Sequence, residues 1–358
     1  MQENILDYII VGCGVAGTNL AIHLMQSDKK LVIIDDEQST CSSIVAAGVL
    51  NPITGKRLVK SWQSENALPY AKEFYLELEK TLDAEFFHEN KILQVCKSKE
   101  EEELWLFRKQ DPDYAFFLKG KLEANSLECI KDSFGSFYIE GVARIETEIF
   151  CAKAKEYFKG KGVYETDNFD YEKLCTEGDI VEYKGIKAKN IIFCEGYKAI
   201  ENPYFNWLPF APAKGEILCF KSDAKLPKEI IHKEKWLMRI DDNSFRCGST
   251  WDRENFNQEV RDEAVEELEK ALKNILQNTT YLELCGKSAG VRPCTKTTRP
   301  FLGTHPKDAK LHIFNGFGSK GYALSPYFAS EFTKYLNDNY QFEPQANIAR
   351  HLKKFFKD

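Results

Sequence analysis

Short apolar segments of strand length alternate along this chain with longer segments whose apolar residues recur at helical spacing. The runs 8–11 and 31–34 carry no charged residue and are typical of strands buried on both faces of a sheet. Further strands are predicted at residues 190–194, 215–220, 236–240, 245–248 and 311–314. Amphipathic helices are predicted at residues 66–82, 147–159, 258–276 and 323–335. This alternation predicts an α/β protein with helices packed on a doubly wound sheet.

A glycine loop follows the first predicted strand. Gly12, Gly14 and Gly17 form the motif G-x-G-x-x-G between that strand and the next helix. In dinucleotide-binding folds the first glycine permits the turn, the second lets the backbone approach a pyrophosphate, and the third lets helix and strand pack closely. Asp35 ends the second strand, where an acid hydrogen-bonds ribose hydroxyls. We predict a dinucleotide site at the helix N-terminus; the alternative is a glycine turn in an ordinary α/β sheet.

Composition narrows the possible classes of protein. The 358 residues suggest about two domains, and a net charge of −6 gives no reason to expect a nucleic acid partner. No apolar run is long enough to span a membrane, and no export signal precedes Asp7, so we expect a cytoplasmic protein. The histidines lack metal-ligand spacing and the 11 cysteines include no C-x-x-C pair, which predicts reduced thiols and no metal site.

A segment of small residues follows Asp35 at residues 41–52. Small side chains let the backbone approach a bulky ligand, and the hydroxyls of Ser42 and Ser43 are donors for a phosphate. A tightly packed loop would have the same composition. Arg57 and Lys60 follow, three residues apart, and would face the same way on a helix, although two surface charges would give the same pattern.

A second glycine-rich loop lies near the C-terminus. Gly316, Gly318 and Gly321 follow the predicted strand at 311–314 and precede the last predicted helix. Glycines at a helix N-terminus again leave amide N–H groups free beside the positive end of the helix dipole. Two such loops at one sheet edge can hold both ends of a large dinucleotide, which favours FAD over NAD.

Four sequence blocks together resemble the D-amino-acid-oxidase-type flavoprotein superfamily over nearly the whole chain. They are GCGVAG with Asp35, SSIVAAGVLNP, NIIFCEG, and GVRPCTKTTRPFLG followed by NGFGSKGYALSP. Glycine or sarcosine oxidase-like enzymes are similar, as is the flavin domain of the bacterial enzyme that modifies tRNA wobble uridine. The resemblance implies an α/β fold with a Rossmann-like FAD-binding domain and a second, mixed-sheet α+β substrate domain. The expected FAD domain comprises residues 1–80, 139–210 and 286–358, and the substrate domain comprises residues 81–138 and 211–285.

The resemblance also implies which residues hold FAD. The adenosine diphosphate half is assigned to Gly12, Gly14, Val15, Ala16, Gly17 and Asp35. The flavin side of the pyrophosphate is assigned to Ser42, Ser43, Ala47, Gly48 and Val49, with Gly196 at the middle crossing. The border of the flavin ring is assigned to Gly316, Phe317, Gly318, Ser319, Lys320, Gly321 and Tyr322. We expect noncovalent FAD, because Cys294 lies near but not at the position of the cysteine that some relatives bond to flavin.

Arg292 is the main candidate for substrate binding and catalysis. A planar guanidinium holds a carboxylate through two hydrogen bonds, and members of the amino-acid-oxidising branch place an arginine here. The alternative role is a structural ion pair. Lys320 and the last helix are expected to stabilise negative charge at the N1–C2=O edge of reduced flavin. Ser319 stands where glycine-oxidising relatives have an arginine, which argues against glycine itself as the substrate.

Four further residues complete the candidate site. By resemblance, Arg57 and Lys60 lie near the flavin, Arg57 as a catalytic candidate and Lys60 as a substrate-binding one. Trp236 and Trp251 fall on strands that roof the pocket and are substrate-binding candidates.

These features predict an FAD enzyme that oxidises the C–N bond of a small amino acid or secondary amine by hydride transfer to flavin N5. Water hydrolyses the imine, and O2 or another acceptor takes the electrons. One alternative is a tRNA-modifying flavin domain acting on a carboxymethylaminomethyl group, but the acidic balance and the lack of a basic stripe count against it. The other is a flavin-binding protein without catalysis, against which Arg292 and the roof aromatics count.

Overall fold

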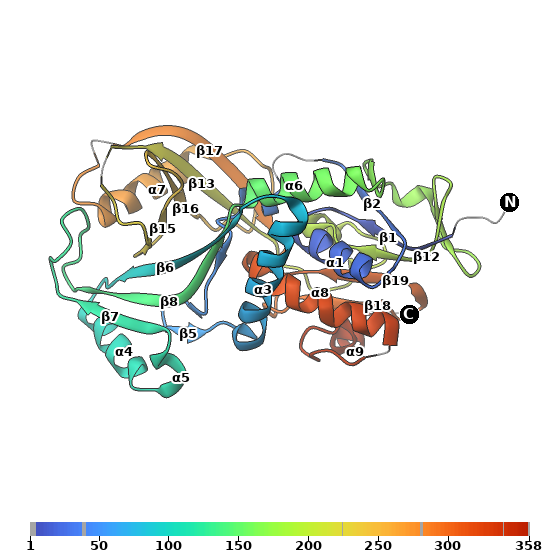
Figure 1. Ribbon diagram of the computed structural model, residues 1–358, viewed down its shortest axis with the longest axis horizontal. Coiled ribbons are helices and arrows are strands. Elements are labelled where there is room, and N and C mark those ends of the chain that lie inside the picture. The colour runs from blue at the N-terminus through green and yellow to red at the C-terminus, as the bar shows by residue number, and fades with distance from the viewer. Residues whose placement is uncertain (1–4, 38–40, 224, 280–281, 339, 357–358) are drawn as a thin grey trace.

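The computed structural model describes residues 5–37, 41–223, 225–279, 282–338 and 340–356. Two β-sheets organise these residues, and Figure 1 shows them at opposite ends of the long axis of the molecule. Helix α3 (Ser64–Leu82) crosses between the two halves. This arrangement confirms the predicted α/β class and the presence of a second, mixed sheet.

The first sheet has a parallel centre in the order β9–β2–β1–β12–β19. Its strands are β1 (Leu6–Val11), β2 (Leu31–Asp35), β9 (Tyr164–Thr166), β10 (Leu174–Cys175), β11 (Val181–Tyr183), β12 (Ile186–Phe193), β18 (Phe301–His305) and β19 (Asp308–Asn315). Tyr8 and Ile10 pack with residues of α1 (Val15–Gln26) and α8 (Gly321–Asp338), whereas Ile9 and Val11 belong to a second core cluster. Both faces are buried, which explains the uninterrupted apolar run of β1.

The second sheet is antiparallel except where β14 runs parallel to β6, and its order is β17–β13–β16–β15–β14–β6–β8–β3 with β7 beside β8. Its strands are β3 (Val49–Leu50), β6 (Phe87–Val95), β7 (Leu118–Leu122), β8 (Ser136–Ile145), β13 (Ala213–Lys221), β14 (Ile230–His232), β15 (Trp236–Arg239), β16 (Ser244–Gly248) and β17 (Glu283–Arg292). Helix α7 (Asp262–Ile275) covers one face through Leu268, Leu272 and Ile275. On the other face, Ile139 and Met238 pack in a core cluster with Trp105, and further residues of this face line a cavity.

The remaining elements are short or lie at the periphery. They are α2 (Ser42–Val45), β4 (Ile53–Thr54), β5 (Val59–Lys60), α4 (Lys99–Lys109), α5 (Pro112–Ala115), α6 (Thr147–Gly160) and α9 (Leu352–Phe355). Within the described ranges, no helix combines the length and apolar character needed to cross a membrane.

Most predicted elements occur within a few residues of their predicted ends, and two predictions need adjustment. The helix predicted from residue 258 begins at Asp262, because residues 253–261 form a loop. Arg57 and Lys60 do not share a helix, because residues 55–58 turn between β4 and β5. The expected domain boundaries at 138/139 and 285/286 fall inside β8 and β17 of the second sheet.

Candidate active site

A cavity of about 1810 Å³ runs between the carboxyl ends of the parallel strands and the open face of the second sheet. The end of β2 contributes Asp35 to its wall, and the end of β17 contributes Arg292. Ligands of open α/β sheets bind outside the carboxyl ends of the strands, so the cavity lies where such a ligand is expected.

Each glycine of the first loop has a steric reason to be glycine. Gly12 has φ of +98°, and a Cβ there would lie 2.7 Å from the carbonyl oxygen of Cys194. A Cβ on Gly17 would lie 1.9 Å from the carbonyl oxygen of Gly12, so α1 can pack this closely on the loop only with glycine. A Cβ on Gly14 would lie 2.9 Å from Ser43 Oγ. The motif therefore forms a tight cradle, and its role in binding FAD stays a prediction.

The N-terminus of α1 presents hydrogen-bond donors to this cradle. The Cys13 N–H donates to Asp35 Oδ2 at 2.7 Å, and the Val15 N–H donates to Ser43 Oγ at 2.9 Å. Among the described residues, the amides of Ala16 and Gly17 donate to no backbone acceptor. Free amides at the positive end of a helix are suited to a phosphate.

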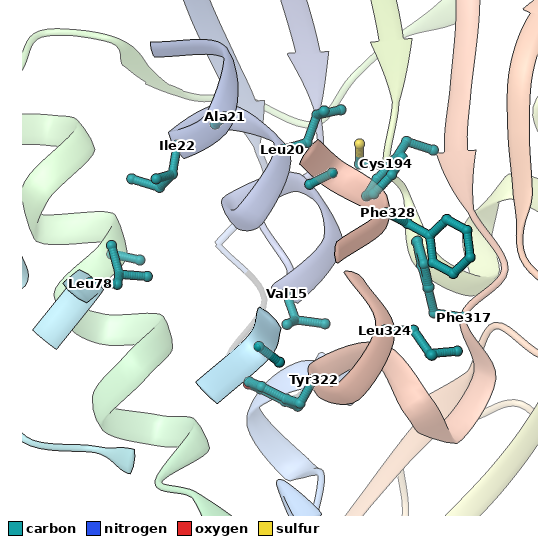
Figure 2. Close-up of a cluster of buried hydrophobic side chains, with 14 of the residues drawn as sticks. Val15, Leu20, Ala21, Ile22, Leu78, Cys194, Phe317, Tyr322, Leu324 and Phe328 are labelled. Atoms are coloured by element: carbon teal, nitrogen blue, oxygen red, sulfur yellow. The ribbon is translucent and has the colours of Figure 1, made fainter. Parts of the chain in front are cut away.

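The second glycine loop brings the N-terminus of α8 against that of α1. A Cβ on Gly321 would lie 2.8 Å from Val15 Cγ1, and Figure 2 shows Val15 beside Tyr322 and Leu324 at this junction. The buried Tyr322 hydroxyl donates to the carbonyl oxygen of Ser43 at 2.9 Å. Two helix dipoles thus direct their positive ends toward one cavity, which suits a dianionic pyrophosphate and an anionic ring.

The small-residue segment forms a further wall of the cavity. Gly48 has φ of +68°, and a Cβ there would lie 2.2 Å from the carbonyl oxygen of Ile145. Arg246 of β16 donates to the carbonyl oxygens of Val45 at 2.6 Å and Ala46 at 3.4 Å, which fixes the end of α2 from the second sheet. Burial lowers the pKa of Arg246. The residues present fit a dinucleotide cofactor that reaches from Asp35 to this wall.

Comparison with known families matches residues 7–335 to the FAD dependent oxidoreductases. This chain belongs to that family. It is 23% identical to a glycine oxidase of Bacillus licheniformis over 343 residues, covering 89% of this chain and 90% of the relative. It is 22% identical to the uncharacterized oxidoreductase YurR of Bacillus subtilis over 350 residues, covering 92% and 94%. The structure of glycine oxidase from Geobacillus kaustophilus superposes with a TM-score of 0.81 at 17% identity, covering 96% and 97%. The protein is therefore an FAD enzyme, as the resemblance implied.

In this FAD enzyme the guanidinium of Arg292 lies in the cavity, held by neutral groups. Its Nη2 donates to Ser249 Oγ at 2.6 Å, and its Cζ lies 5.0 Å from the centre of the Trp251 ring. The guanidinium covers Gly215 of β13, where a Cβ would lie 1.9 Å from Nη2. Within the part of the chain that the structure describes, no carboxylate pairs with Arg292. The structural ion pair considered as the alternative is absent there, and the charge is available for an anion.

The roof aromatics lie at the same place. Trp236 lines the cavity from β15, and a Cβ on Gly248 of β16 would lie 2.7 Å from its indole. Trp251 also lines the cavity and 53% of its surface is exposed, but the prediction that it lies on a strand is wrong, because β16 ends at Gly248. Ser249 and Gly215 were not singled out in the sequence, although Ser249 precedes Trp251 by two residues.

The basic candidates separate into two groups. Lys320 lines the cavity at the start of α8, with Nζ 3.4 Å from Ser61 Oγ. Burial, assisted by the charge of Arg299, lowers the pKa of Lys320. Arg57 is exposed on the turn after β4 and does not line the cavity. Lys60 also lies outside the lining and pairs with Glu65 and, at 3.5 Å, with Asp113.

Most cofactor candidates line the cavity, and two act behind its wall. Gly17 and Gly316 do not line the cavity. Gly316 has φ of +80°, and a Cβ there would lie 2.8 Å from Thr295 Cγ2. Gly196 lines the cavity with φ of +62°. Glu195, which is not among the residues predicted from the sequence, also lines the cavity and accepts hydrogen bonds from Tyr171 and Asn202. Burial raises the pKa of Glu195 to about 7 against these hydrogen bonds. The sequence signal that could have identified Glu195 is its position directly before Gly196.

A buried ionic network supports the segment that carries Ser249 and Trp251. Glu216 of β13 accepts from Arg261 Nη2 at 2.9 Å and from Thr250 Oγ1 at 2.6 Å, and neither Glu216 nor Lys214 is exposed. The Asp252 N–H donates to the Lys214 carbonyl oxygen at 3.0 Å. Burial by itself would raise the pKa of Glu216, but the hydrogen bonds from Arg261 and Thr250 outweigh it and lower the pKa to about 2.

We expect this network to make the protein sensitive to acid. Because the pKa of Glu216 is lower in the folded state, its stabilisation is complete above the ordinary value of 4.5 and is lost as pH falls toward 2. The loss is about 3 kcal/mol in the free energy of unfolding. Urea unfolding of the wild type and of Glu216→Gln between these pH values measures it. On acidification, the free energy of unfolding should fall more for the wild type than for the variant. An equal fall in both proteins would show that ionised Glu216 does not provide this stabilisation.

Proposed function

We propose that this FAD enzyme oxidises the C–N bond of an amino acid or N-substituted amino acid that carries a free carboxylate. The observation that carries the proposal is the guanidinium of Arg292, which lies in the cavity between Ser249 and Trp251 and has no carboxylate partner among the described residues. A buried cation without an acid gains most from an anionic ligand, and a bidentate carboxylate matches its geometry. The glycine oxidase relatives support a substrate of this class.

In this proposal the chain binds and orients the substrate. Arg292 holds the carboxylate, and its contacts with Ser249 and Trp251 restrict the guanidinium before the substrate arrives. The indoles of Trp236 and Trp251 line the cavity and would cover the bound substrate. FAD, when bound, supplies the acceptor for the hydride that leaves the carbon next to nitrogen. The nitrogen loses a proton, the C–N bond becomes an imine, and water hydrolyses it. We assign no general base.

Anaerobic reduction of the purified enzyme tests this function. D-amino acids, glycine, sarcosine, proline and longer N-alkylglycines are mixed with the enzyme without oxygen, and bleaching of flavin absorbance is followed. We expect bleaching by at least one carboxylate-bearing amine and none by the matched amine without a carboxylate. Acid precipitation should release the FAD into the supernatant, because no covalent bond is expected. Bleaching by the simple amines alone would contradict the proposal, and FAD retained in the pellet would contradict noncovalent binding.

A further inference from the structure

The face of the second sheet that lines the cavity carries a row of side chains from adjacent strands. Strand pairing places Gln94 of β6 opposite His232 of β14, His232 opposite Trp236 of β15, and Trp236 opposite Gly248 of β16. Gly248 in turn lies opposite Ile217 of β13. Directly paired residues point to the same face of a sheet. Gln94, His232, Trp236 and Ile217 all line the cavity, so the row runs away from the Arg292 end.

His232 presents a hydrogen-bond acceptor at the far end of this row. Its Nδ1 lies 2.8 Å from Gln94 Oε1, which accepts and therefore fixes the proton on Nδ1. Burial lowers the pKa of His232 to about 4, so the ring is neutral and Nε2 keeps its lone pair. Among the described residues, this ring makes its hydrogen bond through Nδ1, and none is formed at Nε2. Glycine or sarcosine bound at Arg292 would leave this acceptor without a partner.

The spacing of the strands sets the length of the ligand that would join the two ends. The guanidinium of Arg292 lies over Gly215 of β13, and β14 is three strands farther along the sheet. Three strand spacings amount to roughly 14 Å. The Trp236 indole lies between, over Gly248 of β16, and offers an apolar surface to the middle of a ligand. The row is thus polar at both ends and apolar at its centre.

We propose that the substrate is an amino acid with a long, mostly apolar substituent whose far end is a hydrogen-bond donor, such as a hydroxyl or amide, bound by Nε2 of His232. Lys97 and Glu101 line the cavity beside His232 and pair with each other at 3.2 Å. Lys233 and Glu234 line the cavity there as well, so the charges of these four residues sum to zero. A neutral donor is therefore favoured over a second carboxylate. This inference rests on the proposed function, since it takes the carboxylate at Arg292 as given.

Binding of unreactive analogues tests the inference. Alkoxyacetic acids have an ether oxygen in place of the amine and cannot form an imine. Propyl to heptyl chains ending in methyl are compared by calorimetry with chains of equal length ending in hydroxyl, using the FAD-loaded enzyme. The same comparison is made with chains carried on the α-carbon. We expect one length at which the hydroxyl analogue binds about tenfold more tightly, the gain of one satisfied hydrogen bond.

Variants identify the partner of the hydroxyl. His232→Leu should abolish the preference, and His232→Asn, which keeps an acceptor on a shorter side chain, should move the preferred length to a longer chain. Ile231→Val is the control, because Ile231 is the neighbour on β14 but faces the core under α7. It should leave the preference unchanged. A merely structural role of His232 would not shift the preferred length.

The outcomes separate this inference from the proposed function. If carboxylates bind in an Arg292-dependent way but hydroxyl and methyl analogues bind equally at every length, the inference is overturned and the proposed function stands. If binding does not depend on Arg292, the proposed function fails first. If His232→Leu does not fold, the length shift in His232→Asn decides, and an unchanged preferred length overturns the inference.

Discussion

Replacing Arg292 with alanine should reduce kcat/KM for amino acids by roughly thirtyfold or more while FAD stays bound. Removing one partner of a buried charge pair typically weakens the interaction by about 2–5 kcal/mol. The substrate carboxylate would lose the cation that fixes it against Ser249 and Trp251. Steady-state kinetics on an amino acid and on the matched amine without a carboxylate measure the effect. The value of kcat/KM should fall far more for the amino acid than for the amine.

Gly215→Ala provides a matched variant that keeps the charge but moves it. A Cβ on Gly215 would lie 1.9 Å from Arg292 Nη2 and 2.4 Å from Nη1, and these atoms are the mobile end of a flexible side chain. The guanidinium should therefore shift while the backbone stays in place. We expect kcat/KM to fall selectively for amino acids in this variant as well. Equal losses on both substrates in Arg292→Ala would mean that Arg292 shapes the pocket without binding a carboxylate, and loss of flavin would indicate a structural role.

The parts of the site that depend on local sequence were predictable. The glycine loop, Asp35 and the buried strand β1 lie within 30 residues of one another, and each has a local physical reason for its residues. The loop before α8 was found by the same rule, since glycines at a helix N-terminus leave amides free. The sequence could not show that the two helix N-termini touch, because Val15 and Gly321 are brought together only by the order of the strands.

The parts that depend on pairing across the second sheet were not predictable. Gly215, Ser249 and Arg292 come from β13, the end of β16 and β17, and their proximity follows from strand registers that the sequence did not reveal. His232 reaches the cavity only because β14 pairs with β6 and β15. Arg57 shows the opposite problem, since the family resemblance suggested a site residue and the turn at residues 55–58 leaves it exposed.

Gly17→Ala should eliminate FAD binding and destabilise the protein. The new Cβ would lie 1.9 Å from the Gly12 carbonyl oxygen and 3.3 Å from Cys194 Cβ, so α1 must move away from the loop that it closes. Forcing an extra carbon into a packed site typically lowers the free energy of unfolding by about 1–3 kcal/mol, and a backbone clash belongs at the upper end. The displaced amides of Ala16 and Gly17 would no longer face the phosphate position.

Thermal unfolding with and without added FAD measures both effects. A ligand that binds only the folded state raises Tm by an amount that grows with the logarithm of its affinity, so the FAD-dependent rise in Tm should disappear in Gly17→Ala. Gly160→Ala is the control, because this last residue of α6 has no atom within 4 Å of the Cβ position. It should keep its FAD and gain up to about 1 kcal/mol of stability from helix propensity. A normal FAD response in Gly17→Ala would show that the N-terminus of α1 does not bind the pyrophosphate.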